Sequence, residues 1–184
     1  MKGLQKMSIL VIAIVAIGFS SCGVKDKLDI NIPFSVSFDG SLNLTIPDVG
    51  LDASFNISDS ISIKSVEDLA DDLDRLKSLE VQDVELHITN FSGNANSEIE
   101  GALELNGSFG GTDAPFGPSN LQAVSDSGLP IILEFDASEQ ESISDALLAF
   151  EKLELVLSGL ASSPPLSFDY ELVFNFKAVA NPLD

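Results

Sequence analysis

The sequence predicts a mainly β fold, an antiparallel β-sandwich or open barrel with two short amphipathic helices. Several segments alternate apolar and polar residues, the period of a strand that buries one face. Two other segments space their apolar residues three and four apart, the period of a helix that buries one face. Hydrophobic residues make up 45% of the 184 residues, so the chain can build a core despite a formal charge of -20.

The first part of the domain is predicted to be β-structure. Apolar residues occupy every second position over 28–38. Asp39-Gly40 follows, and we interpret it as a hairpin turn into a second strand over 42–46. Further alternating runs over 49–57 and 61–63 predict two more strands.

The hydrophobic period changes after these strands. Four apolar residues between 66 and 76 are spaced three, four and three apart, which predicts a helix over 66–77. Ser65 has the side chain expected of its N-cap.

Alternation returns over 79–88 with a shift by one position at Asp83, which predicts a long strand with a bulge. A run over 99–105 is predicted to be its hairpin partner, and Asn106-Gly107 to be the next turn. Residues 109–121 are rich in glycine and proline, so we expect an extended loop there.

The last third of the chain is predicted to contain three strands and the second helix. Strands are expected over 129–135 and 153–157, and a helix over 138–150 between them. The longest uninterrupted alternation is over 166–178, and we expect this strand to lie centrally in its sheet.

Composition excludes several classes of function. The chain has 29 Asp and Glu against 9 Lys and Arg, whereas nucleic-acid binding depends on clustered basic residues, so we expect no nucleic-acid partner. His87 is the only imidazole and Cys22 the only thiol, so neither a nucleophilic triad nor a zinc site is expected. We predict a protein that is not an enzyme, has no cofactor and exposes His87 on a strand.

The first 22 residues have the layout of a signal peptide. Lys2 and Lys6 precede an apolar stretch over 7–19, and small residues follow. As a helix this stretch would be only about 20 Å long, shorter than the hydrocarbon core of roughly 30 Å, so a permanent membrane span is disfavoured.

Phe19-Ser20-Ser21-Cys22 resembles the lipobox of bacterial lipoproteins, although Leu is usual at the position of Phe19. The resemblance implies that residues 1–21 are removed and that Cys22 is lipidated. Residues 22–28 would then form the lipidated cysteine and tether, and residues 29–184 a single β-rich globular domain. The alternatives are an ordinary secretory signal with an incidental cysteine, or a short membrane anchor.

The same resemblance implies a location in the cell envelope, held at a membrane by the lipid on Cys22. We expect the outer membrane of a Gram-negative bacterium, on either its periplasmic or its surface face. Lys25-Asp26 resembles a weak surface-export signal, the alternative being a plain hydrophilic linker. Asp59-Ser60-Ile61 resembles an O-glycosylation acceptor triplet of some envelope proteins, with Ser60 as the acceptor.

These observations favour a non-enzymatic structural or interaction module that binds an envelope protein or a surface polymer. The alternative is a carrier of a hydrophobic ligand in a cavity between sheet and helices, because a lined pocket and a filled core have the same inward alternation. A third hypothesis is cation binding by loop carboxylates.

Overall fold

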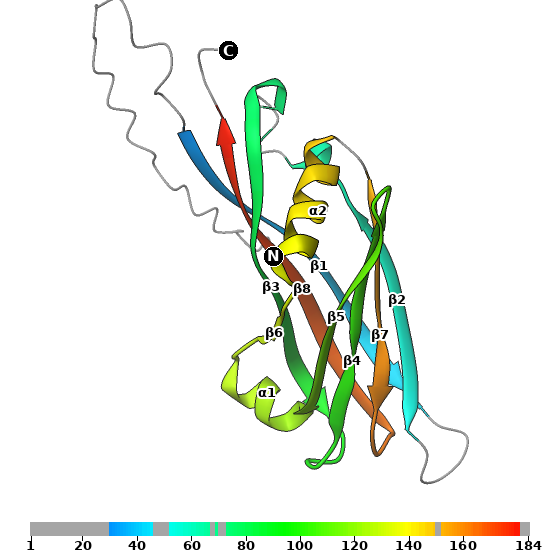
Figure 1. Ribbon diagram of the computed structural model, residues 1–184. Coiled ribbons are helices and arrows are strands. Elements are labelled where there is room, and N and C mark those ends of the chain that lie inside the picture. The colour runs from blue at the N-terminus through cyan, green and yellow to red at the C-terminus, as the bar shows by residue number, and fades with distance from the viewer. Residues whose placement is uncertain (1–29, 46–51, 67–68, 70–72, 150–151, 181–184) are drawn as a thin grey trace, which may run out of the picture.

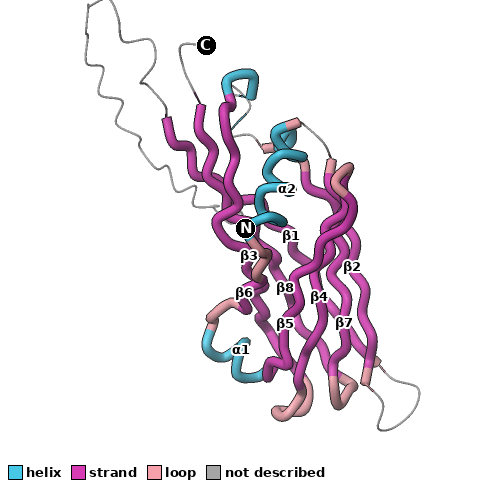
Figure 2. Tube along the Cα trace, in the orientation of Figure 1, coloured by secondary structure: helices cyan, strands magenta, loops and turns pink. Residues whose placement is uncertain are grey.

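The computed structural model describes residues 30–45, 52–66, 69, 73–149 and 152–180. These residues form two four-stranded sheets that pack face to face (Figures 1 and 2), with neighbouring strands antiparallel throughout. The predicted class, a mainly β-sandwich with two helices, is confirmed.

We call the two sheets A and B. Sheet A has the strand order β1 (Ile30–Leu44), β8 (Leu166–Ala180), β3 (Leu76–Ser92), β6 (Ile131–Leu133). Sheet B has the order β2 (Ala53–Ile61), β7 (Leu153–Ala161), β4 (Glu98–Gly107), β5 (Gly110–Asn120). Helices α1 (Leu121–Ser127) and α2 (Ala137–Leu148) lie before and after β6 in the chain.

The strands pair in a nested order. Strand β1 pairs with β8, β2 with β7, β3 with β6 and β4 with β5. In addition, β8 pairs with β3 in sheet A, and β7 pairs with β4 in sheet B. Among the described strands, only β4 and β5 are both consecutive and in one sheet; every other connection crosses between the sheets. This is the topology of an eight-stranded jelly roll.

The predicted central position of the last strand is confirmed, because β8 lies between β1 and β3. Its inward side chains, with the exception of Tyr170, are almost fully buried. The Phe176 ring stacks on Phe34 of β1 with centroids 5.0 Å apart and on Phe174 at 6.1 Å. Phe38 of β1 meets Phe174 edge-on at 6.1 Å, so aromatic contacts join β8 to its neighbour over several residues.

The prediction of a turn at Asp39-Gly40 is wrong. Strand β1 runs through both residues and keeps an unbroken register with β8 from Ile30 to Leu44. The glycine is needed for packing, because a Cβ on Gly40 would lie 2.6 Å from the hydroxyl of Tyr170, the residue opposite.

The predicted hairpin of 79–88 with 99–105 is also wrong, because β3 belongs to sheet A and β4 to sheet B. The bulge in β3 is confirmed by a register shift between Val81 and Asp83. The turn expected at Asn106-Gly107 lies one step later, since Gly107 still pairs with Gly110.

Residues 110–120, expected to be a loop, form strand β5. This strand is at the edge of sheet B, where Pro115 and Pro118 are tolerated because an edge strand does not need every N–H for a ladder. Helix α1 follows directly, and the side chain of Asn120 caps it by accepting from the N–H of Ala123 at 2.8 Å.

The helix predicted over 138–150 is confirmed as α2. Its first turn has a capping box in which Asp136 accepts from the N–H of Glu139 at 2.9 Å and Glu139 accepts from the N–H of Asp136 at 2.7 Å. The bond from the Glu139 N–H favours the ionised form of the Asp136 carboxyl and is the main cause of its lowered pKa, followed by the bond from the Ser138 hydroxyl.

The helix predicted over 66–77 is wrong in its described part. Ser65 lies inside a 3-10 turn, Ile63–Ser65, and is not an N-cap. A second 3-10 turn, Leu73–Arg75, leads directly into β3, because Leu76 already pairs with Ala180 of β8. Residues 67, 68 and 70–72 of this prediction lie outside the described residues.

Strands β4 and β7 approach closely at a pair of glycines. Gly101 is opposite Gly159, and a Cβ on Gly101 would lie 2.1 Å from the carbonyl oxygen of Ser158. That obstacle is backbone and cannot rotate away. The pair therefore lets the two central strands of sheet B keep their spacing.

We predict that Gly101→Ala destabilises the fold by about 1–3 kcal/mol, the usual cost of overpacking. Gly111→Ala is the matched control in the same sheet, because its Cβ would meet only the mobile side-chain amide of Asn106. Thermal unfolding followed by circular dichroism measures both changes. Equal melting temperatures for the two variants would contradict the close approach.

Candidate interaction surface on sheet A

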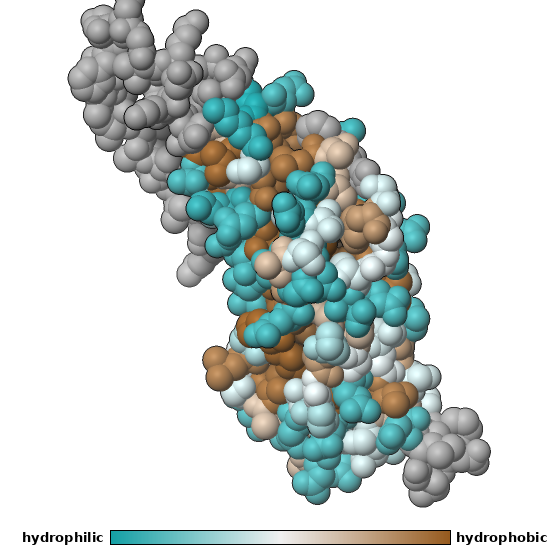
Figure 3. Space-filling model, in the orientation of Figure 1, coloured by the Kyte–Doolittle hydropathy of each residue, from teal (hydrophilic) through white to brown (hydrophobic). Residues whose placement is uncertain are grey.

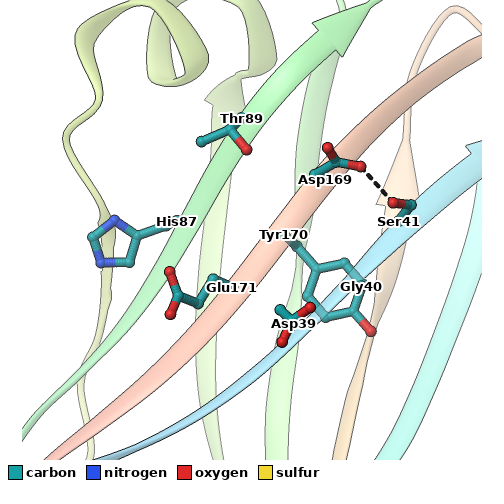
Figure 4. A pocket seen from close by; sticks show the side chains of 8 residues that line it. All are labelled: Asp39, Gly40, Ser41, His87, Thr89, Asp169, Tyr170 and Glu171. Carbon is teal, nitrogen blue, oxygen red and sulfur yellow. Dashed lines mark hydrogen bonds between the residues drawn. The ribbon is translucent and has the colours of Figure 1, made fainter. Parts of the chain in front are cut away.

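The outer face of sheet A has a shallow depression of about 310 Å³ over its three long strands. Two rows of outward side chains line it: Asp39, Glu171 and His87 in one, Ser41, Asp169 and Thr89 in the other. Figure 4 shows these side chains on β1, β8 and β3. We call this set the polar face.

Asp169 is the most constrained carboxylate of the polar face. Its two oxygens accept separate hydrogen bonds, from the Ser41 hydroxyl at 2.5 Å and from the Asn90 amide at 2.6 Å. Both bonds favour the ionised form, so the pKa of Asp169 is lowered from 3.8, first by Ser41 and then by Asn90, against a smaller opposing effect of burial.

Asn90 reaches Asp169 because β3 is irregular there. The register with β8 shifts between Thr89 and Ser92, and Asn90 has a positive φ of 52°. Asparagine tolerates this left-handed conformation better than most residues. The irregularity turns a residue near the end of β3 towards the side chain of the neighbouring strand.

Further hydrogen bonds continue along the same face of the sheet. The Asn175 side chain accepts from the Ser35 hydroxyl at 2.6 Å and donates to Asp83 at 2.5 Å. The His87 Nε2 and a Glu85 oxygen are 2.8 Å apart. Side chains of β1, β8 and β3 are therefore linked across the sheet.

The polar face and its continuation present mainly hydrogen-bond acceptors, because carboxylates outnumber cationic groups. Within residues 30–45, 52–66, 69, 73–149 and 152–180, no three His, Cys, Asp or Glu side chains gather in a way that could hold a metal ion. The arrangement suits ligands that donate hydrogen bonds, such as hydroxyl, amide or ammonium groups.

Tyr170 lines the same depression, although in the alternation of β8 it falls on the same side as the buried, inward residues. Its ring covers Gly40. Burial raises the pKa of the Tyr170 hydroxyl, and the negative charges of Asp59 and Asp39 raise it further. Asp59 belongs to β2, so a carboxylate at the edge of sheet B also influences the pKa of Tyr170.

The structure separates the site residues predicted from sequence. Cys22 and the tether lie outside the described residues. Ser60 is in β2 opposite Glu154, and its N–H donates to the Asp59 carboxylate at 2.7 Å. His87 is half-buried beside Glu85, less solvated than expected. Sequence reasoning missed Asp169, Ser41 and Asn90, whose proximity depends on pairing between distant strands.

Two further depressions lie beside the helices. One of about 330 Å³ separates β3 from α2 and is lined by both apolar and charged residues. The other, of about 480 Å³, lies between α1 and the segment leading into β6. Figure 3 shows hydrophobic areas near α1 and β6, where Leu129 is 69% and Ile132 48% exposed. None of the described helices is both long and apolar enough to cross a membrane.

We predict that Asn90→Ala and Ser41→Ala each raise the pKa of Asp169 towards 3.8. Because the Asp169 pKa is lower in the folded than in the unfolded protein, its ionised form adds to the free energy of unfolding at pH values above the unfolded pKa. This stabilisation is lost as the pH falls through the pKa of the folded protein. In either variant the stabilisation is smaller, and it is lost at a higher pH than in the wild type. NMR of the side-chain carboxyl carbon measures the titration, with Ser35→Ala as the control. An Asp169 pKa unchanged in both variants would refute the assignment.

No family model matches the chain, and no curated protein matches it. Three similar solved structures are viral. The decameric BFDV capsid protein is 8% identical with a TM-score of 0.42, over 82% of this chain and 98% of that one. Turnip yellow mosaic virus is 12% identical with a TM-score of 0.38, over 98% and 92%. Desmodium yellow mottle tymovirus is 16% identical with a TM-score of 0.28, over 95% and 96%. At these TM-scores the similarities carry no conclusion about function or partners.

Proposed function

We propose that this protein is a lipid-anchored lipoprotein of the cell envelope that acts as a non-enzymatic interaction module. Acyl chains on Cys22 hold it at a membrane, which we propose to be the outer membrane of a Gram-negative bacterium. The β-sandwich presents the polar face to an envelope protein or a surface polymer.

The anchor is supported by the apolar stretch followed by Phe19-Ser20-Ser21-Cys22. Each buried methylene of an acyl chain contributes roughly 0.8 kcal/mol, so two or more chains hold an acidic protein at a membrane without basic residues. Only residues 23–29 separate the cysteine from β1, so the distance from Cys22 to Ile30 is at most about 27 Å. The start of β1 and the end of β8 lie at the same end of the sandwich (Figure 1), which would therefore be nearest the membrane.

The interaction function rests on one observation, the fixed hydrogen-bonded side chains of the polar face and of its continuation along sheet A. Asp169 is held from both sides, and Asn175 is held between β1 and β3. A surface whose acceptors are already ordered loses little conformational entropy when it binds a ligand. Sugar hydroxyls and basic protein side chains both supply the matching donors.

We predict that Cys22→Ser moves the protein from the membrane fraction to the soluble fraction and removes the lipid from its intact mass. Ser21→Ala is the control, because it keeps a small residue before the cysteine and should leave acylation intact. Fractionation and mass spectrometry of the full chain provide the two readouts. Wild-type protein without acyl groups on Cys22 would contradict the anchor.

The interaction is tested by native mass spectrometry after gentle detergent extraction. We predict a protein or polysaccharide bound to the wild type and lost from Asp169→Ala. Glu104→Gln, an exposed carboxylate of sheet B, should retain it. A stoichiometric lipid without either partner would favour the carrier hypothesis instead. The same spectra would show a glycan on Ser60 as added mass that Ser60→Ala lacks.

A further inference from the structure

Strand β1 is the open edge of sheet A. Among the described residues it pairs only with β8. The opposite edge of the sheet is covered, because β6 pairs with residues 84–86 of β3 and both helices pack against β3. Within the part of the chain that the structure describes, the β3 side of the sheet is therefore occupied by other elements, whereas the β1 edge presents a row of backbone groups that no further strand pairs.

The open edge lacks most features that protect edge strands from pairing. Its 15 residues keep register with β8 without a bulge, whereas β3 has three register shifts. Strand β1 contains one charged residue, Asp39, although the whole chain has 29 Asp and Glu, and it contains one proline, Pro33. Natural edge strands are usually short, charged or bulged.

The middle of β1 also exposes apolar surface at the seam between the two sheets. Phe34 and Leu44 are buried, but Val36, Phe38 and Leu42 between them are only half-buried although they face inward. Ile57 of β2, at the adjacent edge of sheet B, is half-buried too. A strand added beside β1 would cover this apolar row.

We propose that two copies of this chain pair antiparallel through β1, with the two-fold axis at Ser37. All 15 residues then overlap, and inward residues stay opposite inward residues. Val36 pairs with the partner's Phe38, and Phe34 lies opposite the partner's Gly40. The two copies of sheet A become one continuous eight-stranded sheet, twice the four strands of each copy.

The charge pattern of β1 favours a near-neutral strand such as a second copy of β1 over a basic strand, because its 15 residues contain one carboxylate, Asp39, and no other charged group. In this register Asp39 lies opposite the partner's Ser35, and the two Asp39 side chains are four residues apart, about 13 Å along the strand. That distance exceeds the Debye length of about 8 Å at physiological salt. The repulsion that remains comes from the formal charge of -20 on each chain. Added salt should therefore strengthen this pairing, whereas it would weaken binding of a basic strand from another protein.

Disulfide trapping in the full chain tests the register. Ser37→Cys places two thiols opposite each other at a Cα distance of about 4.5–5.5 Å, which a disulfide can bridge. Ser35→Cys has the same number of thiols, but its two copies would be about 13 Å apart. We expect covalent dimers from Ser37→Cys and few from Ser35→Cys. Equal cross-linking, or none, would overturn the proposed register.

Two variants that each introduce one positive charge test the interface without cross-linking. Ser37→Lys puts like charges opposite each other across the axis, so the dimer should dissociate to monomer. Ser35→Lys adds the same charge opposite the partner's Asp39 and should keep the dimer. Light scattering after size exclusion in one detergent measures the mass at about 0.15 M and about 1 M salt, and melting curves confirm that both variants fold.

Three results would overturn the proposal. Wild-type protein that is monomeric at both salt concentrations excludes the dimer. A dimer that Ser37→Lys leaves intact places the interface elsewhere. A monomer that binds a basic extended peptide, more weakly at high salt, assigns the β1 edge to a different protein.

Discussion

The pairing of β8 with both β1 and β3 is the constraint on which the rest of the structure depends. The ladder joins nearly every residue of β8 to a partner on each side. On the inward face, Phe168, Leu172, Phe174 and Phe176 are at most 3% exposed. Burying one such side chain contributes about 1.5–3 kcal/mol, so this strand carries a large share of the apolar stabilisation of sheet A. The polar face and the open edge of β1 both exist because β8 fixes the position of β1.

This organisation requires contacts between the two ends of the described chain. Ile30 pairs with Ala180, and the strand pairs become progressively more local until β4 meets β5. Closing the outer pairs costs more chain entropy than forming the β4–β5 hairpin, and topologies dominated by distant contacts fold slowly. The Gly101–Gly159 contact belongs to the inner part of this arrangement, where β7 is added to that hairpin.

The sequence predicted strands well and their partners poorly. Alternation reports only that one face of a segment is buried, so it identified β8, β7 and most of β3 without indicating what lies beside them. Asp39-Gly40 has turn chemistry, yet its glycine accommodates the ring of Tyr170, a residue far away in the chain. The glycines and prolines of 110–120 resembled a loop because an edge strand tolerates residues that a central strand excludes.

The polar face could not be predicted from the sequence, since Ser41, Asn90 and Asp169 meet only through the pairing of strands that are distant in the chain. The proposed anchor, unlike the polar face, could be predicted from the sequence, because the lipobox resemblance depends only on contiguous residues.

Strand β1 combines the two surfaces to which we assign functions. Its outward side chains contribute Asp39 and Ser41 to the polar face, while its backbone edge is open to a second copy. The two proposals do not compete for the same atoms, since a ligand on the face contacts side chains and a paired strand contacts the backbone edge. A dimer would bring two polar faces onto one continuous sheet and increase binding to a repetitive polymer through multivalency.

Hydrogen exchange of the full chain, followed by mass spectrometry of its peptides, tests the central role of β8 most directly. Amides opened only by global unfolding exchange most slowly, and this set identifies the cooperative core of a fold. We expect the peptides of β8, together with the middle of β3, to be the last to exchange. The account would be contradicted if β8 exchanged as fast as the short edge strand β6 while the β4–β5 hairpin remained protected.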